Sequence, residues 1–162
     1  MKAKRLLCWL SVSLLVVFID QWSKFYVLHH FAPGVPYYVL PVFNLTLSFN
    51  PGAAFSFLAK MGGAQIWILS AIAIIMSLLL VVWLYRTPRQ LVGRCLGLSL
   101  VLGGAVGNLI DRVRFGFVVD FFQFHVGSWY FAIFNVADSA VTVGALLLII
   151  SLVSYRDGDL RE

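Results

Sequence analysis

Four aspartates lie at or near the ends of strongly apolar stretches of the chain, and two of them suggest proteolytic chemistry. These are Asp20, Asp111, Asp120 and Asp138. Ionisable groups at membrane depth are costly and are candidates for function by default. Asp120 and Asp138 are expected to meet as a pair that cannot easily ionise together, so that one keeps a proton. The charged member can then activate a water while the protonated member polarises a carbonyl, which is the chemistry of aspartic peptidases.

Other catalytic chemistries find little support in the sequence. His29 and His30 adjoin each other in an expected loop, and His125 follows an aromatic run, so that none has a recognisable Ser or Asp partner. No HExxH or other metal-ligand spacing occurs. Cys8 and Cys95 are far apart and form no CxxC motif. We therefore expect neither a metal nor a cofactor.

Polar residues at helical spacing accompany the aspartates. Asp20 and Lys24 stand four residues apart, a favourable pair on one helix face. Asn135 is a candidate N-cap, which places Asp138 in a first helical turn, where the helix dipole favours negative charge. A further stripe at this spacing consists of Gly104, Asn108 and Arg112, with Asp111 one position away.

The composition is that of a membrane protein. Apolar residues make up 61% of the 162 residues and charged residues 12%, and the mean hydropathy is +0.93. Soluble domains hold about 45–50% apolar and about 25% charged residues, so a soluble globular domain and a disordered chain are both excluded. Since about 20 apolar residues span a bilayer, we expect one integral membrane domain over residues 1–162, with transmembrane helices at about 6–28, 65–85, 94–111 and 136–154.

The basic residues predict the orientation. Cytoplasmic flanks carry an excess of Lys and Arg, so we interpret the net charge of +5 as membrane topology and expect no nucleic-acid partner. With both termini cytoplasmic, eight bases fall inside: Lys2, Lys4, Arg5, Arg86, Arg89, Arg94, Arg156 and Arg161. Four fall outside: Lys24, Lys60, Arg112 and Arg114. The basic N-terminus and Leu6–Ile19 imitate a secretory signal peptide but lack its cleavage site, which predicts an uncleaved first helix.

The two predicted outer segments, 29–64 and 112–135, have β character, whereas the cytoplasmic loop 86–93 is short. Four prolines between residues 33 and 51 argue against a long helix there. Residues 43–49 alternate apolar and polar side chains, as a half-buried strand does, and residues 115–124 are rich in aromatic and β-branched types. We expect an all-α bundle of four transmembrane helices with a small extracytoplasmic β-platform.

Four blocks resemble those of lipoprotein signal peptidases (signal peptidase II), the membrane aspartic peptidases of bacteria. The first is Asp20-Gln-Trp-Ser-Lys24, and the second is Phe49-Asn-Pro-Gly-Ala-Ala-Phe-Ser-Phe57. The third is Gly103-Gly-Ala-Val-Gly-Asn-Leu-Ile-Asp-Arg112, which runs on to Phe115-Gly-Phe-Val-Val-Asp-Phe121. The fourth is Phe134-Asn-Val-Ala-Asp-Ser-Ala140. The blocks occur in order and cover nearly the whole chain.

This resemblance implies a role for each matching residue. Asp120 and Asp138 match the catalytic dyad. Positions around the active site and substrate are matched by Asn50, Gly52, Asn108, Arg112 and Asn135. Supporting positions are matched by Asp20, Lys24 and Asp111, of which Asp20 and Lys24 are expected to form a structural ion pair.

The resemblance also implies a reaction and a fold. The family removes the signal peptide of diacylglyceryl-modified prolipoproteins just before the lipidated cysteine, at the outer face of the bacterial cytoplasmic membrane. It needs no cofactor and is inhibited by the cyclic peptide globomycin. Its fold has four transmembrane helices, an outer β-cradle and a small outer helix. The expected partners are prolipoproteins and membrane lipid, and a monomer is expected.

Two other functions remain open on the sequence. In a small transporter or proton conductor the aspartates would form a relay, but such proteins place acids deep in the bundle and often show repeats or broken helices. In a structural membrane protein or assembly chaperone the polar residues would only join helices. Comparing a cleavage assay with an ion-flux assay distinguishes a peptidase from a transporter or proton conductor. Survival of function without Asp120 and Asp138 would favour a structural protein or chaperone.

Overall fold

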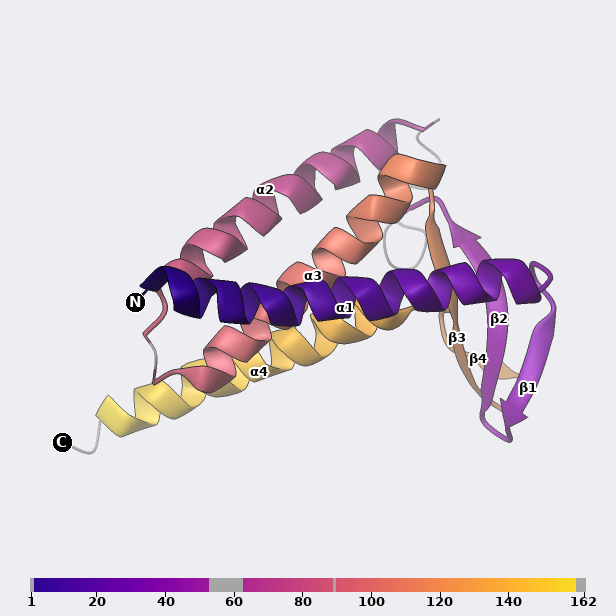
Figure 1. Ribbon diagram of the computed structural model, residues 1–162. Coiled ribbons are helices and arrows are strands. Elements are labelled where there is room, and N and C mark those ends of the chain that lie inside the picture. The colour runs from indigo at the N-terminus through magenta and orange to yellow at the C-terminus, as the bar shows by residue number, and fades with distance from the viewer. Residues whose placement is uncertain (1, 53–62, 89, 160–162) are drawn as a thin grey trace.

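The computed structural model describes residues 2–52, 63–88 and 90–159. Four helices are arranged with one antiparallel sheet at a single end of the bundle (Figure 1). In chain order the elements are α1 (Lys2–His30), β1 (Pro36–Leu40), β2 (Phe43–Asn50), α2 (Ala64–Arg86), α3 (Val92–Phe115), β3 (Val118–Val126), β4 (Trp129–Tyr130) and α4 (Val136–Asp159).

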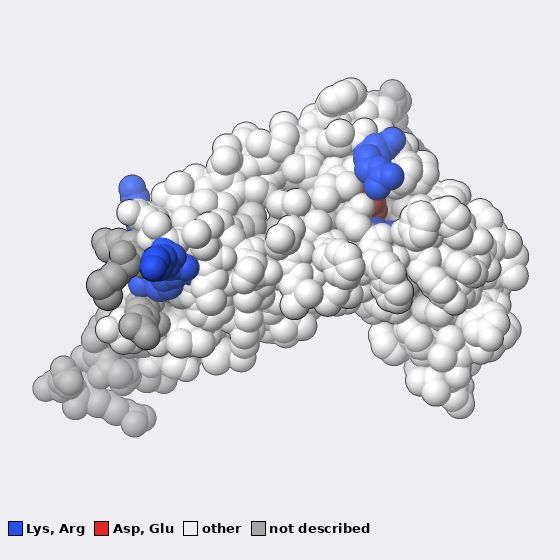
Figure 2. Space-filling model, in the orientation of Figure 1, with Lys and Arg blue, Asp and Glu red and all other residues white. Residues whose placement is uncertain are grey.

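All four helices are long and apolar enough to cross a membrane. Large apolar side chains, such as those of Leu14, Trp67, Leu78 and Ile149, are exposed along them. On the face shown in Figure 2, charged residues gather toward the two ends of the bundle and the band between them carries none. In water such a surface would be unfavourable, whereas in lipid it is the expected outer surface of a helix bundle.

The centre of the bundle is α3, which contacts each of the other three helices. In its most apolar stretch 50% of the residues are buried inside the protein, against 17% in each of the other helices. Glycines make this close packing possible. A Cβ at Gly97 would lie 2.8 Å from the carbonyl oxygen of Gly144 in α4, and one at Gly104 would collide with the carbonyl oxygen of Ala137. Small residues at helix contacts are typical of membrane bundles.

The sheet has the strand order β1-β2-β3-β4, with every pair antiparallel. Its inner face is apolar, and Leu47, Val119 and Phe121 pack with Val27 near the outer end of α1. This contact seats the sheet on the bundle. The predicted combination of a four-helix membrane bundle and a small β-sheet is confirmed. Among the described residues there is no additional short outer helix, and residues 53–62, which include part of the second motif block, lie outside them.

The helices extend beyond the apolar runs from which we predicted them. His29 and His30, expected in a loop, are the last two residues of α1. Residues 112–115, expected in the outer segment, form the last turn of α3, which ends at Gly116 in the left-handed conformation (φ 77°). Hydropathy marks only the part of a helix that lies in lipid, because backbone hydrogen bonding continues into the polar interface.

The contact of Gly104 with the start of α4 predicts the effect of a single methyl group. Gly104→Ala should lower the free energy of unfolding by about 1–3 kcal/mol, because the new Cβ forces α3 and α4 apart. Gly93→Ala is the matched control, since nothing lies within 4 Å of a Cβ there. Thermal unfolding of both variants in detergent tests this, and equal stabilities would contradict the packing described.

Candidate active site

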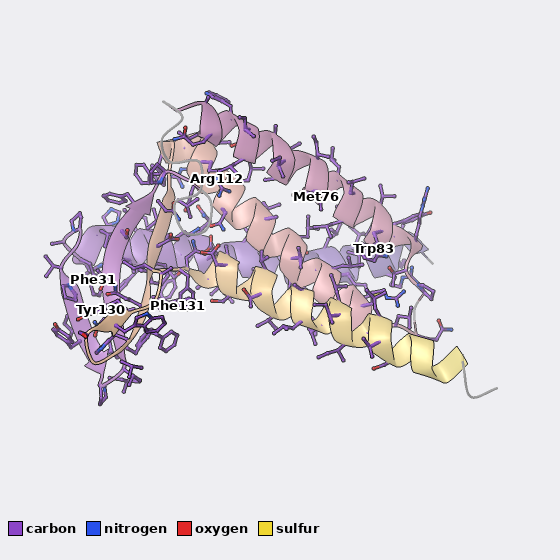
Figure 3. The ribbon with its side chains drawn as sticks, turned by 180° about the vertical axis from the view of Figure 1, so that it is seen from behind. Phe31, Met76, Trp83, Arg112, Tyr130 and Phe131 are labelled. Atoms are coloured by element: carbon purple, nitrogen blue, oxygen red, sulfur yellow. The ribbon has the colours of Figure 1, made fainter. Side chains whose placement is uncertain are left out.

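The cavity between the sheet, the C-terminal end of α3 and the N-terminal end of α4 has a volume of about 280 Å³. It brings together six residues singled out in the sequence: Asn50, Gly52, Asn108, Arg112, Asp120 and Asp138. Figure 3 shows Arg112 near the outer end of α3, and Phe131 beside the start of α4. The wall on that side is the segment 131–134, which continues from β4.

Asp120 is held by β3 and lies opposite Ser48 of β2. Its residue is only 2% exposed. The Asn50 side-chain nitrogen donates a hydrogen bond to Oδ2 of Asp120 (3.0 Å), and the Asn135 side-chain nitrogen donates to Oδ1 (2.7 Å). Two amides from different segments therefore fix one carboxyl group at the cavity.

Asp138 is fixed by the cap of α4. The backbone N–H of Asp138 donates to Oδ1 of Asn135 (2.8 Å), and the backbone N–H of Asn135 donates to Oδ2 of Asp138 (3.3 Å). This reciprocal pair is a capping box, with Asn135 at the N-cap as its position predicts. Asn108 of α3 donates its side-chain N–H to the other carboxylate oxygen of Asp138 (2.8 Å). The hydrogen bonds that start α4 therefore also orient this carboxylate.

Asn135 is the common partner of both aspartates. It is fully buried, and its amide oxygen caps α4 beside Asp138 while its amide nitrogen faces Asp120. The same nitrogen lies 3.1 Å from the side-chain oxygen of Asn108 and 3.3 Å from the carbonyl oxygen of Val119. An amide has one acceptor end and one donor end. The nitrogen of this side chain therefore binds the carboxyl group of Asp120, and its oxygen binds the backbone N–H of Asp138, whose carboxylate accepts the backbone N–H of Asn135.

The surroundings of Asp120 favour its protonated form near neutral pH. Burial raises the pKa of Asp120 to about 7, and the nearby charge of Asp138 acts in the same direction. Hydrogen bonds from Asn50 and Asn135 and the charge of Lys24 oppose this rise. Asp120 can therefore hold a proton near neutral pH.

A buried charge cluster lies behind the cavity and consists of Asp20, Lys24 and Asp111. Their exposures are 0%, 2% and 0%, and the Lys24 ammonium is 2.8 Å from a carboxylate oxygen of each aspartate. Lys24 also donates to the side-chain oxygen of Asn108 (3.0 Å). Since that oxygen faces Lys24, the nitrogen of Asn108 is turned toward Asp138.

The same cluster holds the backbone on both sides of the site. Asp20 accepts the N–H of Ala137, which precedes Asp138, at 2.9 Å. Asp111 accepts the N–H of Val119, which precedes Asp120, at 3.1 Å. Each buried carboxylate in the cluster therefore fixes the residue before one of the two cavity aspartates.

Comparisons with known proteins agree with the resemblance seen in the motifs. The family model for signal peptidase (SPase) II matches residues 12–154. The chain is 48% identical to a lipoprotein signal peptidase of Coxiella burnetii (strain RSA 493 / Nine Mile phase I) over 152 residues, which cover 94% of this chain and 93% of the relative. It is 50% identical to a lipoprotein signal peptidase of Burkholderia thailandensis over 141 residues, or 87% and 84% of the two chains.

The chain belongs to the signal peptidase II family. A solved bacterial membrane enzyme also matches the fold with a TM-score of 0.81 and 32% identity, over 91% of this chain and 88% of that one. The predicted family is thereby confirmed, and with it an aspartic-type peptidase that crosses the bacterial inner membrane several times. Membership in a peptidase family disfavours both the transporter and the purely structural interpretation.

Gln21 contributes to the site of this signal peptidase II, although the sequence analysis did not single it out. The side-chain nitrogen of Gln21 lies 2.9 Å from Asp111, 3.1 Å from the carbonyl oxygen of Gly107 and 3.2 Å from Asp20. It therefore ties α1 to α3 beside the charge cluster. Its position next to Asp20 inside the first motif block was the available signal. A single glutamine has no chemical signature of its own, so only the contact reveals its role.

The charge cluster predicts a large loss of stability when its cation is removed. Lys24→Met should lower the free energy of unfolding by about 3–5 kcal/mol, because two buried carboxylates lose their compensating charge. Lys4→Met, which removes an exposed lysine from the same helix, is the control and should change little. Reversible unfolding in mixed micelles measures both variants, and a change below about 1 kcal/mol in Lys24→Met would refute a compensating role.

Proposed function

We propose that the chain removes the signal peptide from diacylglyceryl-modified prolipoproteins by cleaving just before the lipidated cysteine, with Asp120 and Asp138 as the catalytic pair. The observation that carries this proposal is that the two carboxyl groups line one cavity and both accept hydrogen bonds from Asn135, from its side-chain nitrogen at Asp120 and from its backbone N–H at Asp138. Membership in the signal peptidase II family supports the substrate class, because relatives of this chain are lipoprotein signal peptidases.

The proposed reaction uses the two carboxyl groups as base and acid. Asp138 accepts two hydrogen bonds and stands in the first turn of α4, where the helix dipole favours negative charge. In its charged form it takes a proton from a water molecule, whose oxygen adds to the carbonyl carbon of the scissile bond. Asp120, protonated, gives its proton to the carbonyl oxygen.

Collapse of the resulting gem-diol completes the proposed cycle. One hydroxyl proton returns to Asp120, and the proton on Asp138 passes to the leaving nitrogen as the carbon–nitrogen bond breaks. The products are a carboxylic acid and an amine, and the pair again holds one proton. The water is activated by the carboxylates themselves, so no step of this mechanism involves a metal or cofactor.

The remaining cavity residues are proposed to hold the substrate backbone. Asn50 keeps its amide oriented by accepting the N–H of Gly52 (3.0 Å) while donating to Asp120. Arg112 is half-buried in the cavity wall and supplies donors in a fixed planar fork, which suits a carbonyl oxygen or a developing negative charge. Gly52 leaves space at the rim for the peptide to approach.

The location of the cavity suits a substrate that arrives in the membrane. It lies where the helices meet the sheet, so a transmembrane signal helix can present its scissile bond without leaving the lipid. We propose that this end faces outward and that both chain ends are cytoplasmic, which agrees with the excess of bases at the opposite end. All the proposed site residues come from one chain, and we therefore propose that a monomer in contact with lipid is sufficient for activity.

Neutralising either aspartate tests the proposed function directly. Asp120→Asn and Asp138→Asn should each reduce the cleavage of a lipid-modified prolipoprotein by at least about 10²-fold, because the base or the acid is lost. Gel-shift or mass-spectrometric assays with purified protein measure this, and circular dichroism checks that both variants remain helical. Asp157→Asn, at the opposite end of α4, is the control and should cleave normally. Near-normal turnover in either dyad variant would exclude the pair as catalysts.

The raised pKa of Asp120 predicts the pH dependence. Loss of its proton removes the acid, so kcat/KM should fall as the pH rises through about 7. The hydrogen bond from Asn50 lowers the pKa of Asp120, so its removal in Asn50→Ala should raise that pKa. The alkaline limb of the profile of kcat/KM against pH should therefore shift to higher pH. Thr46→Val, which changes a β2 side chain bonded to Gln123, is the control and should leave the limb in place. An unmoved limb in Asn50→Ala would contradict this assignment.

A further inference from the structure

The segment 131–134 lies beside the sheet at the cavity, and among the described residues no strand pairs with its side away from β3. It continues from β4, the last strand in the sheet order, and it runs beside β3. Both backbone polar groups of Phe134 are bonded to β3. Its N–H donates to the carbonyl oxygen of Phe122 (3.0 Å), and its carbonyl oxygen accepts from the N–H groups of Phe122 (2.8 Å) and Phe121 (3.0 Å). The N–H of Phe131 likewise donates to Phe124 (2.9 Å).

The backbone groups of Ile133 are not bonded to β3, unlike the N–H of Phe131 and both groups of Phe134. Within the described part of the chain, neither its N–H nor its carbonyl oxygen has a hydrogen-bond partner. Ile133 lines the same cavity as Asp120 and Asp138. A free donor and a free acceptor are therefore available beside the catalytic pair.

The sequence of this segment does not protect the edge. Natural sheets block free edges with charged side chains, proline or a covering element. The segment reads Phe-Ala-Ile-Phe and contains neither a charge nor a proline. Its edge is thus suited to pair with another extended chain.

The substrate of the proposed reaction needs hydrogen-bond partners for its backbone at the point where it is cut. A peptide bond inside a helix has its carbonyl oxygen engaged in the helical hydrogen-bond ladder, so the signal helix must unwind where it is cut. The unwound peptide groups then require partners, since few waters are available at the depth of lipid. A strand added to a sheet edge satisfies them through main-chain hydrogen bonds, largely independently of side-chain sequence.

We propose that the substrate binds as an added strand on the edge of segment 131–134, with one of its residues hydrogen-bonded to the N–H and carbonyl oxygen of Ile133. This inference rests on the proposed function and deepens it by naming the site that holds the extended peptide. It makes Ile133 a positioning residue that acts through its backbone, and it explains how one site accepts different signal sequences.

An ester scan of the substrate tests the proposal on the unmodified enzyme. A diacylglyceryl lipopeptide is made in a series in which each non-scissile backbone N–H near the cysteine is replaced by an ester oxygen, one position at a time. At one position kcat/KM should fall about tenfold, because the hydrogen bond to the carbonyl oxygen of Ile133 is lost. If the parent lipopeptide is not cleaved, the proposed function fails. If it is cleaved and no position changes kcat/KM by more than twofold, only the added strand is refuted.

Two variants and one further measurement locate the bond at Ile133. Ile133→Ala keeps both backbone groups, so it should retain the full ester penalty. Ile133→Pro keeps the carbonyl oxygen but removes the N–H that donates to the substrate, so its kcat/KM for the parent lipopeptide should fall about tenfold below that of Ile133→Ala. Equal kcat/KM values in the two variants would place the bond elsewhere and overturn the assignment. Independently of whether Ile133→Pro folds, the lipopeptide bound to Asp120→Asn should slow amide hydrogen exchange at Ile133. Unchanged exchange at saturating lipopeptide would also overturn it.

Discussion

The amide of Asn135 is the interaction on which the arrangement of the site depends. Its oxygen caps the first turn of α4, and its nitrogen reaches Asp120 on β3. One residue thereby joins a helix of the bundle to a strand of the sheet. Its side-chain nitrogen donates to the carboxyl group of Asp120, and its backbone N–H donates to the carboxylate of Asp138. Because an amide cannot exchange its donor and acceptor ends without losing both side-chain bonds, the cap of α4 and the bond to Asp120 constrain each other.

The membrane explains why so much polar structure surrounds this amide. A buried charge without compensation costs several kcal/mol, so the fully buried charges of the bundle have defined partners. Lys24 compensates Asp20 and Asp111, and these two aspartates accept the backbone N–H groups of Ala137 and Val119. The glycines of α3 allow these contacts, since a Cβ at Gly107 would lie 2.7 Å from a carboxylate oxygen of Asp20. The structural ion pair and the site thus form one continuous network.

The same burial that makes the network costly also tunes its chemistry. Water would leave both cavity carboxyl groups charged at neutral pH, whereas burial together with the charge of Asp138 keeps a proton on Asp120 up to about pH 7. The fold then offers an extended edge at Ile133 beside this pair. In the proposed reaction the carboxyl pair and the free backbone edge are complementary, because the first would act on a peptide bond that the second keeps unwound.

The sequence by itself determined the class, the four membrane helices and the β character of the segments that form the sheet, and it indicated the residues that are proposed to carry the chemistry. These follow from local properties: hydropathy over about 20 residues, alternation over a few residues, and the order of the Asp, Asn and Lys motifs. The N-cap at Asn135 was also predictable, because a cap depends on neighbouring residues alone. The helix ends were less accessible, since His29 and His30 continue α1 for reasons of backbone hydrogen bonding that hydropathy does not record.

Only the tertiary structure decided how these residues meet. The bond from Asn135 to Asp120, the contacts of Gln21 with Asp111 and Gly107, and the turn of Asn108 toward Asp138 join segments that are far apart or differ in type. The free backbone of Ile133 could not be foreseen either, because its residue type carries no polar signal and its exposure depends on where β4 ends and α4 begins. Residue types set which chemistry is possible, whereas distances, burial and the direction of backbone groups arise from packing between distant parts of the chain.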